Sequence, residues 1–101
     1  MTSDEQAVRA AIAKFYDAIE TLAVGGGVEP MIAAWHHVPF ATASHPMGDW
    51  AHGWEQVMAT WKVLSKSGRP ESGGGSFRDL FVHVCGDAAH STCVYVAGPS
   101  I

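Results

Sequence analysis

The chain has 101 residues, which allow one domain with a single hydrophobic core. Apolar residues make up 48% of the sequence, which excludes a disordered chain, and a net charge of −4 offers no basic surface to nucleic acid. The acidic N-terminus and the absence of an apolar run of roughly 18 residues predict a cytoplasmic protein without a signal peptide or a membrane span.

The first predicted helix begins near Ser3 and ends before the glycines at 25–27. Ser3 and Gln6 have the spacing of a capping box, and three glycines in a row are costly inside a helix. The apolar residues of this segment recur with the period of a helix and form one stripe: Val8, Ile12, Phe15, Ile19 and Leu22.

Two more helices and two short strands are predicted in the middle of the chain. A short helix starts near Pro30, a residue suited to the first helical turn, and a longer one runs over residues 54–65 with the same apolar period. Between them, residues 38–44 and 50–52 are predicted to form strands joined by a turn at 45–49.

The last part of the chain predicts a β-hairpin, in which residues 77–85 and 88–97 flank the turn Gly86-Asp87. A flexible, glycine-rich loop at 68–76 leads into it. The turn sets a register that pairs Cys85 with Ala88, His83 with His90, and Leu80 with Cys93. Both cysteines are expected to be buried, reduced thiols.

Alternation along these two strands separates an inner face from an outer face. The inner face, which is the better core, is predicted to carry Leu80, Val82, Val84, Ala89, Ser91, Cys93 and Tyr95. The outer face is predicted to carry Phe81, His83, Cys85, His90, Thr92, Val94 and Val96. Because the outer face is half polar and half apolar, it fits a sheet surface that another chain partly covers.

Several segments carry a family likeness in their order and spacing: residues 31–37, 41–48, 53–57 and 82–89. Together they resemble the nuclear transport factor 2-like superfamily, which includes the ketosteroid isomerase-like and SnoaL-like families. The resemblance implies an α+β chain with a cone-shaped, cystatin-like fold, in which N-terminal helices pack on a curved, mostly antiparallel sheet. Residues 1–101 would then form a single domain of this kind.

The chain departs from the ketosteroid isomerase pattern at the positions that carry the chemistry. His45 stands where those families have an aspartate as general base, and Phe15 stands where they have a tyrosine that polarises the substrate. The strand that supplies a further acid is missing, because the sequence stops at Ile101. The sheet is therefore either truncated or incomplete. An open sheet edge is a liability that a second copy of the chain could cover, so we expect a homodimer.

His45 is the candidate catalytic residue, since an imidazole suits a general base at neutral pH; the alternative is that it caps its own turn. The resemblance also predicts a pocket for a small apolar or aromatic molecule, lined by Phe15, Trp35, Trp50, Trp54, Cys93 and Tyr95. No metal and no other cofactor is predicted, because no carboxylate or cysteine lies at ligand spacing beside His37, His45 and His52. The pair His83 and His90 could chelate, but an interface or solvent-facing pair is the preferred interpretation.

Three functions follow from these observations and stay open at this point. The first is a binding protein whose apolar, Trp-lined pocket holds a small molecule without chemistry. The second is an isomerase, cyclase or dehydratase with His45 as general base, against which the missing tyrosine and acid count. The third is a homo-oligomeric association module that uses the outer face of the hairpin and needs no ligand.

Overall fold

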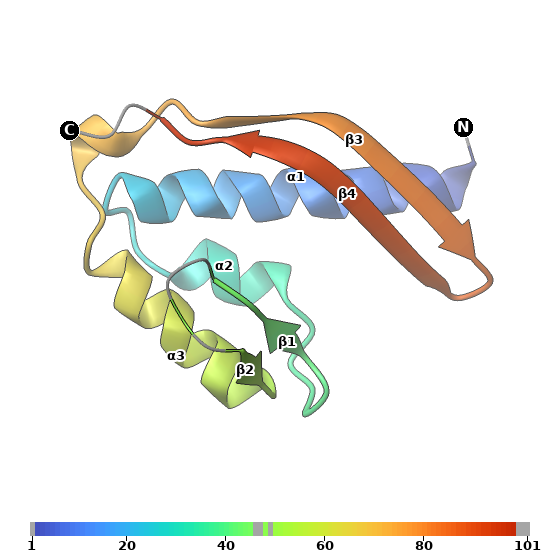
Figure 1. Ribbon diagram of the computed structural model, residues 1–101, viewed down its shortest axis with the longest axis horizontal. Helices are drawn as coiled ribbons and strands as arrows, with labels where there is room; N and C mark the ends of the chain where they lie inside the picture. Colours follow the sequence, from blue (N-terminus) through green and yellow to red (C-terminus); the bar gives the residue numbers. More distant parts are fainter. Residues whose placement is uncertain (1, 46–47, 49, 99–101) are drawn as a thin grey trace.

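Helix α1 (Ser3–Ala23) is the central element, and the other elements pack on different faces of it (Figure 1). The computed structural model describes residues 2–45, 48 and 50–98. One face of α1 is covered by the long hairpin of β3 (Ser76–Cys85) and β4 (Ala88–Val96), which curves along and across the helix. Another face meets helices α2 (Glu29–Ala34) and α3 (Trp54–Ser65), with strands β1 (Thr42–Ala43) and β2 (Ala51–His52) beyond them.

The chain is α+β, as predicted, and its strands form two separate antiparallel sheets of two strands each. One sheet pairs β1 with β2, and the other pairs β3 with β4. The described strands therefore do not join into a single curved sheet, and the cone-shaped fold stays a prediction. None of the helices in the described ranges is long and apolar enough to cross a membrane.

Both ends of α1 are capped, and the N-terminal cap lies one residue earlier than predicted. The side-chain oxygen of Thr2 accepts a hydrogen bond from the Glu5 backbone N–H at 3.1 Å, so Thr2, not Ser3, is the N-cap. At the other end the Gly26 N–H donates to the Thr21 carbonyl at 2.8 Å, and the next residue inward, Gly25, has a φ of 80°. This is the Schellman arrangement, which only a glycine enters without strain.

The core lies where α1, α2, α3 and the β1–β2 sheet meet. Its buried members are Ala18, Leu22, Met31, Ala43, Ala51, Val57 and Trp61. Of the predicted stripe on α1, Leu22 is buried, and Phe15 and Ile19 pack against this cluster with part of their surface exposed. Neither strand of the long hairpin contributes a buried residue to the described core.

The predicted strand at 38–44 is shorter than expected. Only Thr42 and Ala43 pair with β2, because the preceding residues form a turn instead of a ladder. The carbonyl of Val38 accepts hydrogen bonds from the N–H groups of Ala41 and Trp54, at 3.2 and 3.1 Å. The third helix begins and ends as predicted, at 54 and 65. Most of the predicted turn at 45–49 lies outside the described residues.

The long hairpin has the predicted turn and register near its tip, but a β-bulge changes the register further along. Cys85 pairs with Ala88 and His83 with His90, as predicted. The predicted pairing of Leu80 with Cys93 falls at the shift, since Arg78 pairs with Val94 while Phe81 pairs with Thr92 and Leu80 is not a regular pair of the ladder. Two residues of β3 thus stand opposite one residue of β4, and the first of them, Asp79, has a φ of 58°.

The bulge also decides which side chains of β3 face α1. Without it, Phe77 would share the outer face with Phe81, since both numbers are odd. With the extra residue Phe77 is half-buried and stacks on Tyr16 of α1. The predicted inner-face residues are half-buried apart from Ala89, and the predicted outer-face residues are exposed. The expectation of two buried thiols is wrong for Cys85, because that residue lies on the outer face.

Candidate functional site

The residues predicted to line one pocket are separated by the structure into three places. Phe15, Trp35 and Trp54 join the buried Trp61 in an aromatic cluster between the three helices. Phe15 meets Trp35 and Trp61 edge to face, with ring centroids 6.2 and 5.8 Å apart. Trp35 lies 6.1 Å from Trp61 and donates its indole N–H to the Met31 sulfur at 3.2 Å.

The rings of this aromatic cluster pack on one another. Rings in edge-to-face contact at such distances are packed as in a protein core. Trp50, in contrast, is 63% exposed and lies before β2 without an aromatic partner among the described residues. The tryptophans thus divide between a packed interior and a solvent-exposed side chain, and do not surround one cavity.

Cys93 and Tyr95 belong to a second cluster, which joins the hairpin to α1. The thiol of Cys93 donates to the Tyr16 hydroxyl oxygen at 3.2 Å, and the hydroxyl of Tyr95 donates to a carboxylate oxygen of Glu20 at 3.0 Å. The ring of Tyr16 stacks on that of Tyr95, with centroids 5.2 Å apart, and on that of Phe77, with centroids 4.9 Å apart. We name these five residues the tyrosine cluster.

The environment of this cluster disfavours ionised phenols. Burial, followed by the hydrogen bond and the negative charge of Glu20, raises the pKa of Tyr95 from 10.0 to about 12. Burial, followed by the hydrogen bond that links it to Cys93, raises the pKa of Tyr16 to about 12. Both hydroxyls therefore stay protonated at neutral pH, which suits a structural contact and gives no base.

Sequence reasoning missed Tyr16, Glu20 and Phe77 as members of this cluster. Tyr16 and Glu20 are four residues apart on α1, so they form a second stripe beside the apolar one. That spacing was a usable signal, although it does not say what the stripe contacts. Phe77 could not be assigned to the inner face without the bulge.

His45, the predicted general base, is half-buried and held by two residues of α3. Its Nε2 lies 2.9 Å from the Thr60 hydroxyl, whose own proton goes to the Val57 carbonyl at 2.7 Å. The hydroxyl therefore acts as acceptor, and the Nε2 of His45 carries the donated proton. The ring also meets Trp61 edge to face at 4.7 Å. No carboxylate among the described residues is hydrogen-bonded to His45.

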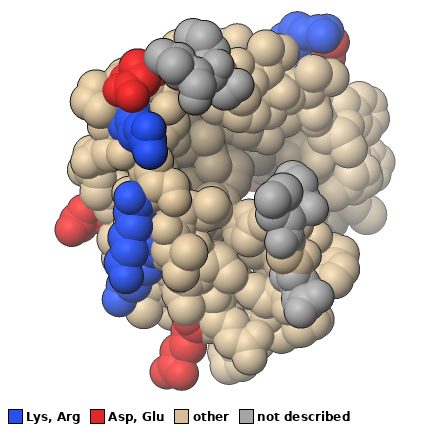
Figure 2. Space-filling model, turned by 60° about the vertical axis from the view of Figure 1, so that its left-hand side comes forward, with Lys and Arg blue, Asp and Glu red and all other residues tan. Residues whose placement is uncertain are grey.

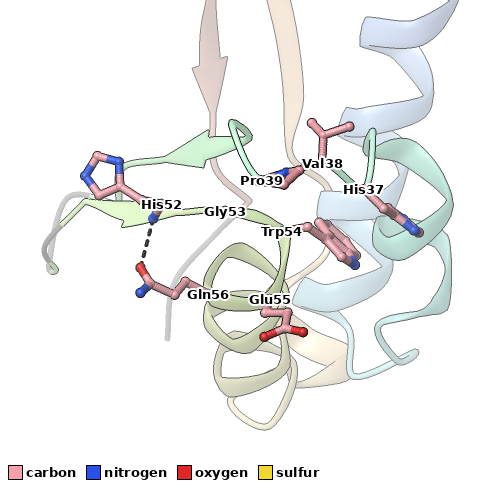
Figure 3. A pocket seen from close by; sticks show the side chains of 8 residues that line it. All are labelled: His37, Val38, Pro39, His52, Gly53, Trp54, Glu55 and Gln56. Carbon is pink, nitrogen blue, oxygen red and sulfur yellow. Dashed lines mark hydrogen bonds between the residues drawn. The ribbon is translucent and has the colours of Figure 1, made fainter.

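A hollow at the start of α3 borders the aromatic cluster at Trp54 (Figure 3). It has a volume of about 490 Å³ and is lined by His37, Val38, Pro39, His52, Gly53, Trp54, Glu55 and Gln56. We name it the α3 groove. His37 stacks flat on Trp54 with centroids 4.0 Å apart, and the backbone N–H of His52 donates to the Gln56 side chain at 2.9 Å.

The α3 groove does not assemble the histidines as a metal site. Figure 3 shows the ring of His52 at one end and the stacked pair of His37 and Trp54 at the other. His45 lies elsewhere, on Thr60. Within the described parts of the chain, no group of three or more His, Cys, Asp or Glu residues could hold a metal ion.

The outer face of the β3–β4 hairpin is the other distinctive surface. It exposes three large apolar side chains, Phe81, Val94 and Val96, and Phe81 is 58% exposed. His83 and His90 face each other across the strands with ring centroids 5.2 Å apart. Arg78 is the one charged side chain at an outer position of the two described strands, and it pairs with the neighbouring Asp79.

Charged side chains elsewhere do not form a basic patch on the face that Figure 2 shows. Lys and Arg side chains lie along the left margin and at the upper right, Asp and Glu side chains are scattered around the rim, and other residues make up most of the surface between them. No family model, no curated protein and no solved structure matches the chain, so the superfamily resemblance stays an expectation drawn from the sequence.

Proposed function

We propose that this chain is a self-association module, in which the outer face of the β3–β4 hairpin packs against the same face of a second copy. The observation that carries the proposal is the exposure of Phe81, Val94 and Val96 on a hairpin with no buried residue. An isolated two-stranded hairpin is marginally stable in water and gains stability when an apolar face is covered. On one side α1 supplies that cover; on the other a second copy would.

The amount of exposed surface supports this proposal. A folded monomer of this mass is expected to expose about 5500 Å². The chain exposes 6782 Å², an excess of about 1300 Å². Its radius of gyration, 14.0 Å, also exceeds the roughly 12.7 Å expected for a chain of this length. A standard interface buries about 800 Å² per partner, so the excess is sufficient for one.

The composition of the outer face also favours a protein partner. Interface cores are depleted in charge and enriched in aromatic side chains. The outer positions of the hairpin combine Phe81 and two valines with two histidines, and the exposed ion pair of Arg78 and Asp79 adds little energy. A second copy is the simplest partner, because an isologous contact needs only one self-complementary patch.

The test is the mass of the purified chain in solution for the wild type, Phe81→Glu and Val94→Glu. We expect a dimer for the wild type, measured by sedimentation velocity, and a monomer for both variants. Burying a carboxylate in this contact is costly, and Arg78, the one cation at an outer position, is already paired with Asp79. Val63→Glu is the matched control, because Val63 is 64% exposed on α3, away from the hairpin. It should remain a dimer.

Circular dichroism separates loss of association from loss of folding in these variants. A wild-type monomer at concentrations of about 100 µM would rule out the association module, since interfaces of standard size reach micromolar affinity or better. A dimer that persists in both glutamate variants would show that another surface is used.

The cone-shaped, cystatin-like fold can be accommodated in this proposal. The curved hairpin over α1 would then be part of the cone, and a second copy would pack on its outer face. A cytoplasmic location fits the two free thiols, which a reducing compartment preserves.

Binding of a small apolar or aromatic molecule is a second candidate, favoured by the α3 groove. Its volume of about 490 Å³ lies in the range of ligand pockets, and it is lined by Trp54. A fragment screen followed by nuclear magnetic resonance would test it: ligands should shift resonances of the groove, and Trp54→Ala should abolish the shifts. Catalysis by His45 rests on the resemblance alone.

A further inference from the structure

We propose that His83 and His90 form a transition-metal site on the outer face of the hairpin, and that the same pair from a second copy completes it. The completed site rests on the proposed association of two hairpins through this face. In each copy the two imidazoles come from adjacent strands and stand opposite each other in the ladder. We assign the site to Zn²⁺, because this ion binds imidazole nitrogen and takes four ligands in tetrahedral geometry.

The separation of the two rings matches what a shared metal ion requires. A zinc–nitrogen bond of about 2.05 Å places the ion roughly 3.2 Å from the centre of each imidazole ring. At the tetrahedral angle, two such rings have their centres about 5.2 Å apart. The rings of His83 and His90 have centroids 5.2 Å apart and planes inclined by 40°, so they are already at the separation of a chelating pair and would rotate to direct their nitrogens at one ion.

The surroundings favour a nitrogen-binding metal over a hard cation. The pair borders a shallow hollow of about 130 Å³, lined by His83, Cys85, Ala88, Ala89 and His90. It holds no carboxylate, and Mg²⁺ or Ca²⁺ would need several oxygen ligands. Because the hollow lies on the exposed face, the ion has a direct path to the imidazoles.

A single chain leaves the site half complete, and a second copy would supply the missing ligands. Two histidines fill two of the four positions around zinc, and the described residues bring no third ligand into a group with them. Sheets packed face to face stand about 10 Å apart, so an ion midway lies about 5 Å from each sheet. A histidine side chain spans that distance, and a two-fold axis through the ion would bring in the second pair.

The experiment uses chain freed of metal by dialysis against EDTA, then titrated with ZnCl₂. Calorimetry gives the number of ions bound, and sedimentation velocity gives the mass. We expect one Zn²⁺ per two chains and at least a tenfold tighter dimer, with both effects lost in His83→Ala and His90→Ala. His36→Ala, which removes an exposed histidine outside the hairpin, and Cys85→Ser, which removes the neighbouring thiol, should behave like the wild type.

The outcomes separate this inference from the proposed association. A metal-free dimer that Phe81→Glu disrupts, together with no zinc binding, would overturn the metal site and leave the association module standing. One zinc ion per chain without a change of mass would overturn the shared site. A third outcome is a chain that is monomeric without zinc and dimeric with zinc, with the dimer lost in both histidine variants. That result would support the metal site and rule out association in the absence of metal.

Discussion

The tyrosine cluster allows one prediction to be worked through in detail, because Tyr16 and Tyr95 are the two tyrosines of the chain. The appearance of tyrosinate absorbance near 295 nm therefore reports this cluster alone. In the folded chain both phenols should ionise around pH 12, since the pKa of each is raised to about 12. In denaturant both should ionise near pH 10, the ordinary value for tyrosine.

The same shifts predict how stability depends on pH. Below pH 10 the phenols are protonated in the folded and the unfolded chain, so their stabilising contribution is complete. Between pH 10 and 12 the unfolded chain loses protons that the folded chain keeps, so the free energy of unfolding falls as pH rises. A two-unit shift corresponds to about 2.7 kcal/mol in a sealed site, and we expect about 1 kcal/mol per tyrosine here, because solvent screens half-buried rings.

Glu20→Gln is the variant that tests the cause of the shift at Tyr95. It removes the negative charge and keeps an acceptor for the Tyr95 hydroxyl, so the pKa of Tyr95 should fall toward its ordinary value while burial still holds it above. Asp17→Asn is the control, since Asp17 is an exposed acid on the same helix. If all the tyrosinate of the folded wild type appears near pH 10, the hairpin is not docked on α1 as described.

Two further predictions concern the backbone. Gly68→Ala should lower the free energy of unfolding, measured by urea titration, by about 2–4 kcal/mol. A Cβ at this position would lie 2.6 Å from the backbone nitrogen of Gly25 and would also clash with the Leu22 carbonyl. An unchanged midpoint would mean that the ends of α1 and α3 do not meet at this glycine. Asp79→Gly should raise the free energy of unfolding by about 0.5–1 kcal/mol in the same titration. Glycine adopts a φ of 58° without strain, and the exposed ion pair with Arg78 contributes little. A loss of stability would argue against the bulge.

Periodicity predicted the helices well because it depends on residues close in sequence. The segment 54–65 folds as a helix with the predicted ends, and the turn at Gly86-Asp87 sets the register of its nearest pairs. The bulge was not predictable in this way. The alternation of β3 is broken at Asp79, and nothing in the sequence around this residue indicates its positive φ. Once the bulge is present, residues before it, such as Phe77, lie on the face opposite to the one that strict alternation would give them.

The candidate site was harder to predict than the fold. The apolar surface of a tryptophan ring can pack equally well on a ligand or on another tryptophan. Composition therefore cannot distinguish a pocket wall from a packed core. Trp35 and Phe15 contact other rings because α1, α2 and α3 converge, which is a property of the tertiary structure. The cross-strand pair of histidines, in contrast, followed from the two-residue turn and was found from the sequence.

The position of α1 between the hairpin and the other helices has a consequence for local unfolding. The hairpin packs mainly on α1, whereas the buried core lies where α1 contacts α2 and α3. The strands β3 and β4 can therefore open without exposing that core. Segments that open separately exchange their amide hydrogens faster than the core does. If a second copy covers the outer face, each opening must also break the dimer, and the protection of these amides then rises with protein concentration. The exchange rate of the hairpin amides, followed as protein concentration changes, would thus report the association of two chains.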